Sequence, residues 1–232
     1  MIRPITVRNL HEQVVQELGR LIVVGEIAQG ENLPREELLA KRMKVSRTVL
    51  REAMKVLSAK GLVESRQGTG ARVRDAAHWS QFDADVLAWR CASAPGGDFI
   101  DKLMEMRELI GLAAAAAAAR RRDEEQLDRI EAACTAMDAA ADPDALAKAG
   151  LACHEAVLHA AHNELMASLF SLIGNALGDR SMPAASGAGD AGRTPAHHRK
   201  LLDAIRRRQP DAARRAMQEM VAGSRGDARR RA

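Results

Sequence analysis

Aromatic residues are almost missing from this sequence: Phe, Trp and Tyr together make up 2% of its 232 residues, and Tyr is absent altogether. A β-sandwich or β-barrel needs aromatic and β-branched side chains, whereas a core of Leu, Ala, Val, Ile and Met favours helices. The shortage also argues against binding of single-stranded nucleic acid on stacked rings. Hydrophobic residues still account for 47% of the chain, which is ample for a helical core.

Cysteines and long apolar runs are also scarce. The three cysteines, Cys91, Cys134 and Cys153, are widely spaced and form no CxxC motif, and no apolar signal segment precedes them. We therefore expect reduced thiols. No apolar run reaches the ~18 residues that a membrane span needs, because the alanine-rich run after Leu109 ends at Arg120. The sequence therefore predicts a soluble, cytoplasmic protein with no membrane partner.

The charge of the chain is unevenly distributed. Residues 1–75 carry 14 Lys and Arg against 9 Asp and Glu, and residues 205–232 carry 9 against 3. Between them, residues 76–204 carry 12 against 19. A basic N-terminal segment followed by an acidic body indicates that only the N-terminal segment approaches a polyanion.

The segment Val45–Leu57, VSRTVLREAMKVL, carries the clearest pattern in the basic segment. As a helix it places Arg47, Arg51 and Lys55 on one face, at i, i+4 and i+8, and leaves its apolar residues on other sides. Ser46 stands where an N-cap would begin that helix. Two interpretations fit the pattern: a helix that enters the major groove of DNA, or an ordinary amphipathic helix with a solvated face.

The flanking sequence favours the first interpretation. Apolar spacing predicts a helix over 8–24 and a second over 36–42, ahead of a third that ends at Gly61. Two short runs around Gly68-Thr69-Gly70 then predict a hairpin. Three helices and a hairpin in this order are typical of a winged helix-turn-helix. Its wing would carry cations towards phosphate or the minor groove, namely Arg66, Arg72 and Arg74.

Residues 10–74 resemble the DNA-binding domain of GntR-type bacterial transcription regulators. The resemblance is carried by GEIAQGENLP from Gly25, VSRTVLREA from Val45, LSAKGLV from Leu57 and GTG from Gly68. One position departs from the family, because Glu37 stands where the LPSER segment of the family has Arg; Arg35 is the candidate replacement. The resemblance and the charge pattern together give these candidate DNA contacts: Arg35, Ser46, Arg47, Thr48, Arg51, Lys55, Arg66, Gly68 and Gly70.

The rest of the chain divides into a joint, a body and a tail. We expect a DNA-binding domain over 1–75 (the head), a linking segment over 76–98 (the joint), a helical domain over 99–222 (the body) and a disordered basic tail over 223–232. The joint holds most of the scarce aromatic residues, and we expect its apolar side chains to pack the head against the body. These are Trp79, Phe82, Val86, Leu87 and Trp89.

The body reads as about six helices, interrupted by a Gly-, Ala- and Ser-rich segment over 181–195 that predicts a mobile loop. After a GntR-like head it resembles the FCD ligand-sensing domain of FadR-type regulators. The matching segments are MREL from Met106, HEAVL from His154 with His162-Asn163, and HRKLLDAI from His198. The predicted fold is therefore mainly α, with a winged helix-turn-helix followed by an all-α FCD-type bundle.

Many FCD domains hold a divalent metal with one Asp and three His. The resemblance places Gly150, His154, His198 and Met220 at those positions, so two of the four ligands are missing. A site that has lost its carboxylate and one imidazole is poorly suited to such an ion. We therefore expect no metal cofactor, with His154 and His198 as the remaining candidate ligands.

The segment FDADVLAW and the HEAVL motif also resemble the subset of FCD regulators that represses galactonate-utilisation genes. This resemblance implies a sugar acid or related hydroxy acid as effector. Arg107 would pair with the carboxylate, and His154, Asn163 and His198 would bond hydroxyls. The subset usually has Asp where this chain has Gly150, and Glu where it has Gly111, which leaves room for a different effector.

The sequence therefore predicts a homodimeric regulator that binds double-stranded operator DNA of a carbohydrate or organic-acid catabolic operon, in most such proteins as a repressor released by its effector. A metal- or acyl-CoA-responsive regulator of the same family is the alternative. An enzyme built on His154 and His198 is an alternative from another class, but no nucleophile–base pairing, phosphate loop or intact metal set supports it. A packaging protein that binds any duplex would leave the acidic body unexplained.

Overall fold

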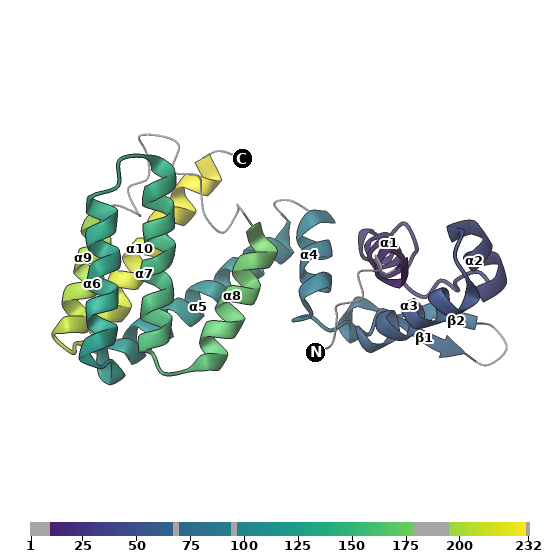
Figure 1. The fold of residues 1–232 in the computed structure, drawn as a ribbon, viewed down its shortest axis with the longest axis horizontal. Helices are drawn as coiled ribbons and strands as arrows, with labels where there is room; N and C mark the ends of the chain where they lie inside the picture. The colour runs from purple at the N-terminus through teal and green to yellow at the C-terminus, as the bar shows by residue number, and fades with distance from the viewer. Residues whose placement is uncertain (1–9, 67–69, 94–96, 179–194, 231–232) are drawn as a thin grey trace, which may run out of the picture. The chain divides into compact units, whose positions relative to one another are not determined.

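The computed structural model describes residues 10–66, 70–93, 97–178 and 195–230, with side chains described up to Val221. The chain forms two compact units, Met1–Phe99 and Ile100–Ala232. Helices dominate both (Figure 1), which confirms the predicted fold class. No helix in the described ranges is long and apolar enough to cross a membrane.

Over its described residues, the first unit contains four helices, a short 3-10 helix and a two-stranded sheet. In chain order these are α1 (Leu10–Val24), α2 (Glu36–Met43), α3 (Arg47–Ala59), β1 (Val63–Arg66), β2 (Gly70–Val73), η1 (Ala76–His78) and α4 (Ala84–Ser93). The strands pair antiparallel, with Val63 opposite Val73 and Arg66 opposite Gly70. This is the predicted winged helix-turn-helix with one added helix, α4.

The three helices of the head meet in one apolar core. Leu18 and Ile22 of α1 pack with Leu50 and Leu57 of α3, and all four are almost fully buried. The turn between α2 and α3 is tight because Lys44 adopts a left-handed conformation at φ 56°, and the amide of Val45 donates to the carbonyl of Ala40. The core therefore fixes α3 relative to α1, and the turn fixes it relative to α2.

The segment expected to link the two domains belongs largely to the core of the first unit. Trp79, Val86 and Trp89 join the same apolar cluster, and Leu87 is buried, whereas Phe82 is exposed. The indole nitrogen of Trp89 donates to Gln16 at 2.9 Å, which ties α4 to α1. Most of the apolar side chains that we expected to join head and body therefore complete the head.

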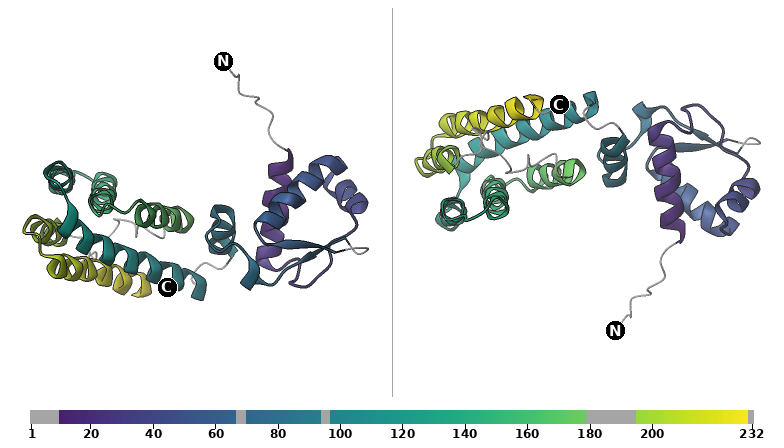
Figure 2. Two further views of the ribbon diagram at one scale, coloured as in Figure 1. Left: turned by 90° about the horizontal axis from the view of Figure 1, so that it is seen from below. Right: turned by 90° about the horizontal axis from the view of Figure 1, so that it is seen from above.

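The described part of the second unit is a bundle of six helices. They are α5 (Asp98–Arg121), α6 (Glu124–Asp138), α7 (Pro143–Ala160), α8 (Glu164–Leu177), α9 (Pro195–Arg206) and α10 (Pro210–Arg230). In both views of Figure 2, α5 runs between α10 on one side and α7 and α8 on the other. Ala114–Ala119 of α5 are buried, because small side chains let the surrounding helices approach closely.

The C-terminal end of the body differs from the sequence prediction. α10 continues to Arg230, although a disordered tail was predicted from residue 223. Ala and Arg are strong helix formers, and the tail contains no proline to end the helix, so two glycines do not stop it. The expected loop over 181–195 lies almost wholly outside the described residues, as does Gly68 of the predicted wing tip.

Candidate nucleic-acid interface and ligand site

α3 presents its cations outward and its apolar residues inward. The Ser46 hydroxyl accepts from the amide of Val49 at 3.2 Å, so it caps the helix as predicted. Leu50, Ala53 and Leu57 are fully buried. The side chains of Arg47, Arg51 and Lys55 are 57%, 62% and 73% exposed. The packing that holds α3 in the head therefore leaves its cationic face open to a partner.

Each of these three cations forms an ion pair with a nearby glutamate. Arg47 lies 2.8 Å from Glu37, and Arg51 lies 2.8 Å from Glu36. Lys55 pairs within α3, with Glu52 at 2.8 Å. Exposed pairs of this kind contribute about 0–1 kcal/mol each, so a stronger anion can exchange with the glutamates.

The remaining predicted contacts lie around the same face. Arg35 is the exposed N-cap residue of α2, and Thr48 is exposed in the first turn of α3. Arg66 on β1 pairs with Glu64 at 3.2 Å, and Gly70 begins β2 at φ 90°. The candidate contacts thus come from α2, α3 and the wing of one unit.

A groove of about 380 Å³ lies between α2, α3 and the wing. Its lining includes Glu36, Arg51, Lys55 and Gly70, which are predicted contacts or their ion-pair partners. The structure therefore brings the cationic face of α3 and the base of the wing to one concave surface.

Arg72 has a role that the sequence did not indicate. Its side chain donates to the carbonyl of Gly30 at 2.7 Å, and the backbone of Asn32 bridges to Arg72 as well. The segment before α2, which contains Gly30 and Asn32, therefore lies along β2 and stabilises the wing. We had expected Arg72 to point towards phosphate, and its bond to Gly30 instead makes it a structural residue of the head.

Four side chains from four helices of the body form a second candidate site. The guanidinium carbon of Arg107 on α5 lies 4.2 Å from the ring centroid of Phe170 on α8. The ring of His154 on α7 stacks on Phe170 at 6.3 Å and meets His198 on α9 edge-on at 5.7 Å. Arg107, His154 and His198 were predicted together from three separate motifs, and the structure places them in one cluster.

Phe170 completes this cluster and was missed from the sequence. The only sequence feature that distinguished Phe170 was the rarity of phenylalanine, which occurs three times in the chain. A guanidinium over an aromatic face is held there by cation–π attraction. The ring therefore orients the fork of Arg107, and a fixed fork suits bidentate binding of a carboxylate.

Asn163 does not belong to this cluster. Its side-chain oxygen accepts from the amide of Met166 at 3.2 Å and caps α8. α7 continues for six residues beyond His154, a rise of about 9 Å, before Asn163 is reached. The structure thus gives Asn163 a capping role, and its predicted bond to an effector hydroxyl stays a prediction.

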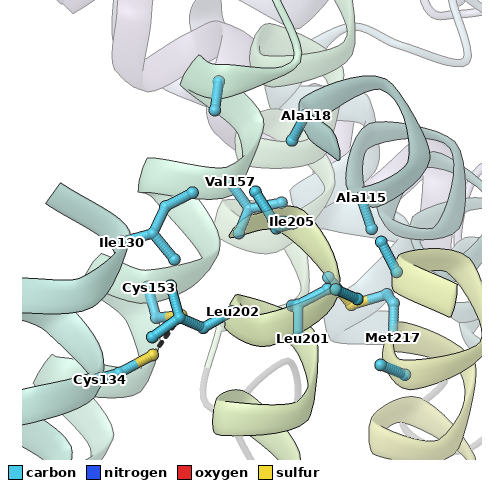
Figure 3. Packing of buried hydrophobic residues seen from close by; sticks show 14 of the residues in the cluster. Ala115, Ala118, Ile130, Cys134, Cys153, Val157, Leu201, Leu202, Ile205 and Met217 are labelled. Carbon is cyan, nitrogen blue, oxygen red and sulfur yellow. Dashed lines mark hydrogen bonds between the residues drawn. The ribbon is translucent and has the colours of Figure 1, made fainter. Parts of the chain in front are cut away.

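A pair of buried thiols lies beside the cluster. The sulfur atoms of Cys134 on α6 and Cys153 on α7 are 3.9 Å apart (Figure 3). Cys134 also contacts the backbone carbonyl of His198. The interaction with Cys153 lowers the pKa of Cys134, whereas that interaction and burial raise the pKa of Cys153. Both cysteines remain free, as the sequence predicted.

Both units of this chain are similar to known families. The family described as "Bacterial regulatory proteins, gntR family" matches residues 10–73, and the "FCD domain" matches residues 102–223. This protein belongs to the GntR family and carries an FCD domain. It is therefore a DNA-binding transcription regulator and not an enzyme, as predicted.

Relatives of this GntR regulator cover nearly its full length. The galactonate operon transcriptional repressor of Escherichia coli is 34% identical over 220 residues, covering 93% of this chain and 95% of that protein. The transcriptional repressor NanR of Cronobacter sakazakii is 31% identical over 224 residues, covering 93% and 84%. A solved structure of Lar from Listeria monocytogenes shares the fold, with a TM-score of 0.55 at 22% identity and 99% coverage of both chains.

The FCD domain of this regulator does not fit a divalent metal. His154 and His198 are neighbours, but Gly150 offers no ligand and Met220 is a buried thioether of the apolar core. A hard divalent ion prefers carboxylate and imidazole to thioether. Within the described residues, no three His, Cys, Asp or Glu side chains gather in a way that could hold a metal ion.

Proposed function

We propose that this GntR regulator binds operator DNA as a cytoplasmic homodimer through α3 and represses a catabolic operon until a small carboxylate binds its FCD domain. The observation that carries the effector proposal is the cluster of Arg107, Phe170, His154 and His198. The guanidinium supplies the positive charge for a carboxylate. The imidazoles can donate to or accept from hydroxyl groups next to it.

A sugar acid is the effector class that this chemistry favours. A relative that covers most of the chain is a galactonate operon repressor, so galactonate is the first acid to test. A Cβ at Gly111 would lie at ordinary van der Waals distance, 3.8 Å, from both Phe170 and Met217. Gly111 therefore brings no carboxylate to the cluster, and the effector can differ from galactonate.

Thermal denaturation of the purified protein with a panel of acids tests the effector class. We expect one or more sugar or hydroxy acids to raise the Tm, since a ligand at 100 times its Kd stabilises by about 2.7 kcal/mol. The matching neutral sugars should give no shift. Equal shifts from neutral sugars would contradict a carboxylate effector.

Two variants connect the shift to the proposed site. Arg107→Gln should abolish the shift, and Arg107→Lys should weaken it because a lysine ammonium lacks the planar fork. Arg129→Gln removes an exposed charge on α6 of the same domain and should retain the full shift. The acid that stabilises the protein should also weaken DNA binding, typically by about 5–150-fold for allosteric coupling.

A further inference from the structure

Two adjacent glutamates at the start of α2 reach across to two arginines of α3. Glu37 bonds Arg47 and Glu36 bonds Arg51, each at 2.8 Å. Glu36 and Glu37 are the first two residues of α2, and Arg47 and Arg51 are one turn apart on α3. The two pairs therefore form parallel bridges between the helices of the helix-turn-helix, on the face where the candidate DNA contacts lie.

These bridges are not needed to hold the two helices together. The side chains of Arg47 and Glu37 are 57% and 80% exposed, and those of Arg51 and Glu36 are 62% and 49% exposed. Exposed pairs add little stability. Leu39 of α2 and Leu50 of α3 are buried in the same apolar cluster, which holds the two helices together.

The glutamates oppose electrostatic attraction to DNA. Non-specific binding depends on cations that displace counterions from phosphates, and a carboxylate beside each arginine opposes that exchange. A carboxylate accepts hydrogen bonds and donates none, so it cannot bond a phosphate. In the major groove it can accept only from base amino groups, the N4 amino of cytosine or the N6 amino of adenine.

We propose that Glu36 and Glu37 are specificity-determining residues that suppress binding to DNA lacking matching base edges. On mixed-sequence DNA, the paired carboxylates offset part of the attraction of Arg47 and Arg51 for phosphate. On a matching operator, the arginines exchange the glutamates for guanine O6 and N7, and the released carboxylates face base amino groups. This inference rests on the proposed docking of α3 in the major groove.

The test compares Glu36→Gln, Glu37→Gln and the double variant with the wild-type protein, all as full chains. Glu26→Gln is the matched control, because Glu26 pairs with Arg20 of α1 in the same domain and the charge change is identical. The probes are a mixed-sequence duplex and the duplex that the wild-type protein selects from a random library. Fluorescence anisotropy gives Kd for both across a KCl series.

Each glutamine variant should bind the mixed-sequence duplex about 3- to 10-fold more tightly, and the ratio between selected and mixed DNA should fall accordingly. The slope of log K against log salt should steepen by up to about 0.9 for each arginine that gains a phosphate. Glu37→Asp, which keeps the charge, should retain most of the discrimination. A purely structural bridge would leave the salt slope unchanged.

Two failures can be told apart. If the wild-type protein selects no sequence from the library, the proposed function itself fails. If it selects a sequence but the glutamine variants bind mixed DNA no more tightly than Glu26→Gln does, only the role of Glu36 and Glu37 is overturned.

Discussion

Gly19 on α1 is the position where one added methyl group tests the packing of the head most sharply. The indole of Trp89 on α4 lies directly over it. A Cβ at Gly19 would fall 2.7 Å from Cζ2 of that ring and still closer to Cη2 and Cζ3. Carbon atoms in contact prefer about 3.5–4.0 Å, so Gly19→Ala forces the ring to move by about 1 Å or more.

The ring cannot move freely. Trp89 is 7% exposed, and its indole nitrogen is bonded to Gln16. Overpacking a core costs about 1–3 kcal/mol, and loss of the indole hydrogen bond adds about 1 kcal/mol. Replacing Gly by Ala inside a helix returns about 1 kcal/mol of helix propensity. We therefore expect Gly19→Ala to lower the free energy of unfolding of the head by about 1–3 kcal/mol.

Urea denaturation followed by tryptophan fluorescence measures this change. Both tryptophans of the chain lie in the first unit, so the signal reports on the head. In a Trp89→Leu background, where Trp79 remains as the probe, the added methyl group meets no ring. Gly19→Ala should then stabilise the head by up to about 1 kcal/mol, the helix-propensity gain. If Gly19→Ala changed the free energy of unfolding in the same direction in the wild-type and Trp89→Leu proteins, the packing of α4 on α1 would be refuted.

Three further changes test other parts of the head. Ser46→Ala removes the N-cap of α3 and should lower the urea midpoint by an amount equivalent to about 1 kcal/mol; an unchanged midpoint would contradict the cap. Burial raises the pKa of Asp85, but bonds from Lys60 and Gln16 outweigh it and hold the pKa below its ordinary value. The ionised Asp85 carboxylate therefore stabilises the folded protein above the unfolded-state pKa of about 3.9, and this stabilisation is lost as pH falls through the pKa of Asp85 in the folded protein. Asp85→Asn should therefore flatten the acid limb of a plot of Tm against pH. A curve parallel to wild type would show that another group controls that limb. Gly61 has φ 77°, and a Cβ there would clash with the backbone carbonyl of His78, the last residue of η1. Gly61→Ala should therefore lower the free energy of unfolding by more than about 1 kcal/mol and reduce the yield of folded protein, which circular dichroism would measure.

The elements that could be predicted from the sequence are those with local signals. The spacing of Arg47, Arg51 and Lys55 against buried apolar residues located α3, and Ser46 located its first turn. The wing followed from glycines between two short apolar runs. In the body, three motifs predicted Arg107, His154 and His198 separately, and the helical packing then brought them together.

The features that escaped prediction depend on how elements pack against one another. Glu36 and Glu37 lie ten or more residues before the arginines that they pair with, so only the angle between α2 and α3 reveals the bridges. Phe170 has no motif of its own. Asn163 caps α8, a role that its ligand-binding motif did not indicate.

The proposed function requires α3 to read DNA sequence through Arg47 and Arg51. The most direct measurement is the affinity of Arg47→Ala and Arg51→Ala for the duplex that the wild-type protein selects, with Arg20→Ala of α1 as the control of equal charge. Each α3 variant should lose about 1–3 kcal/mol, or roughly 5- to 150-fold, whereas the control should change by less than about twofold. Wild-type affinity in both α3 variants would contradict the claim.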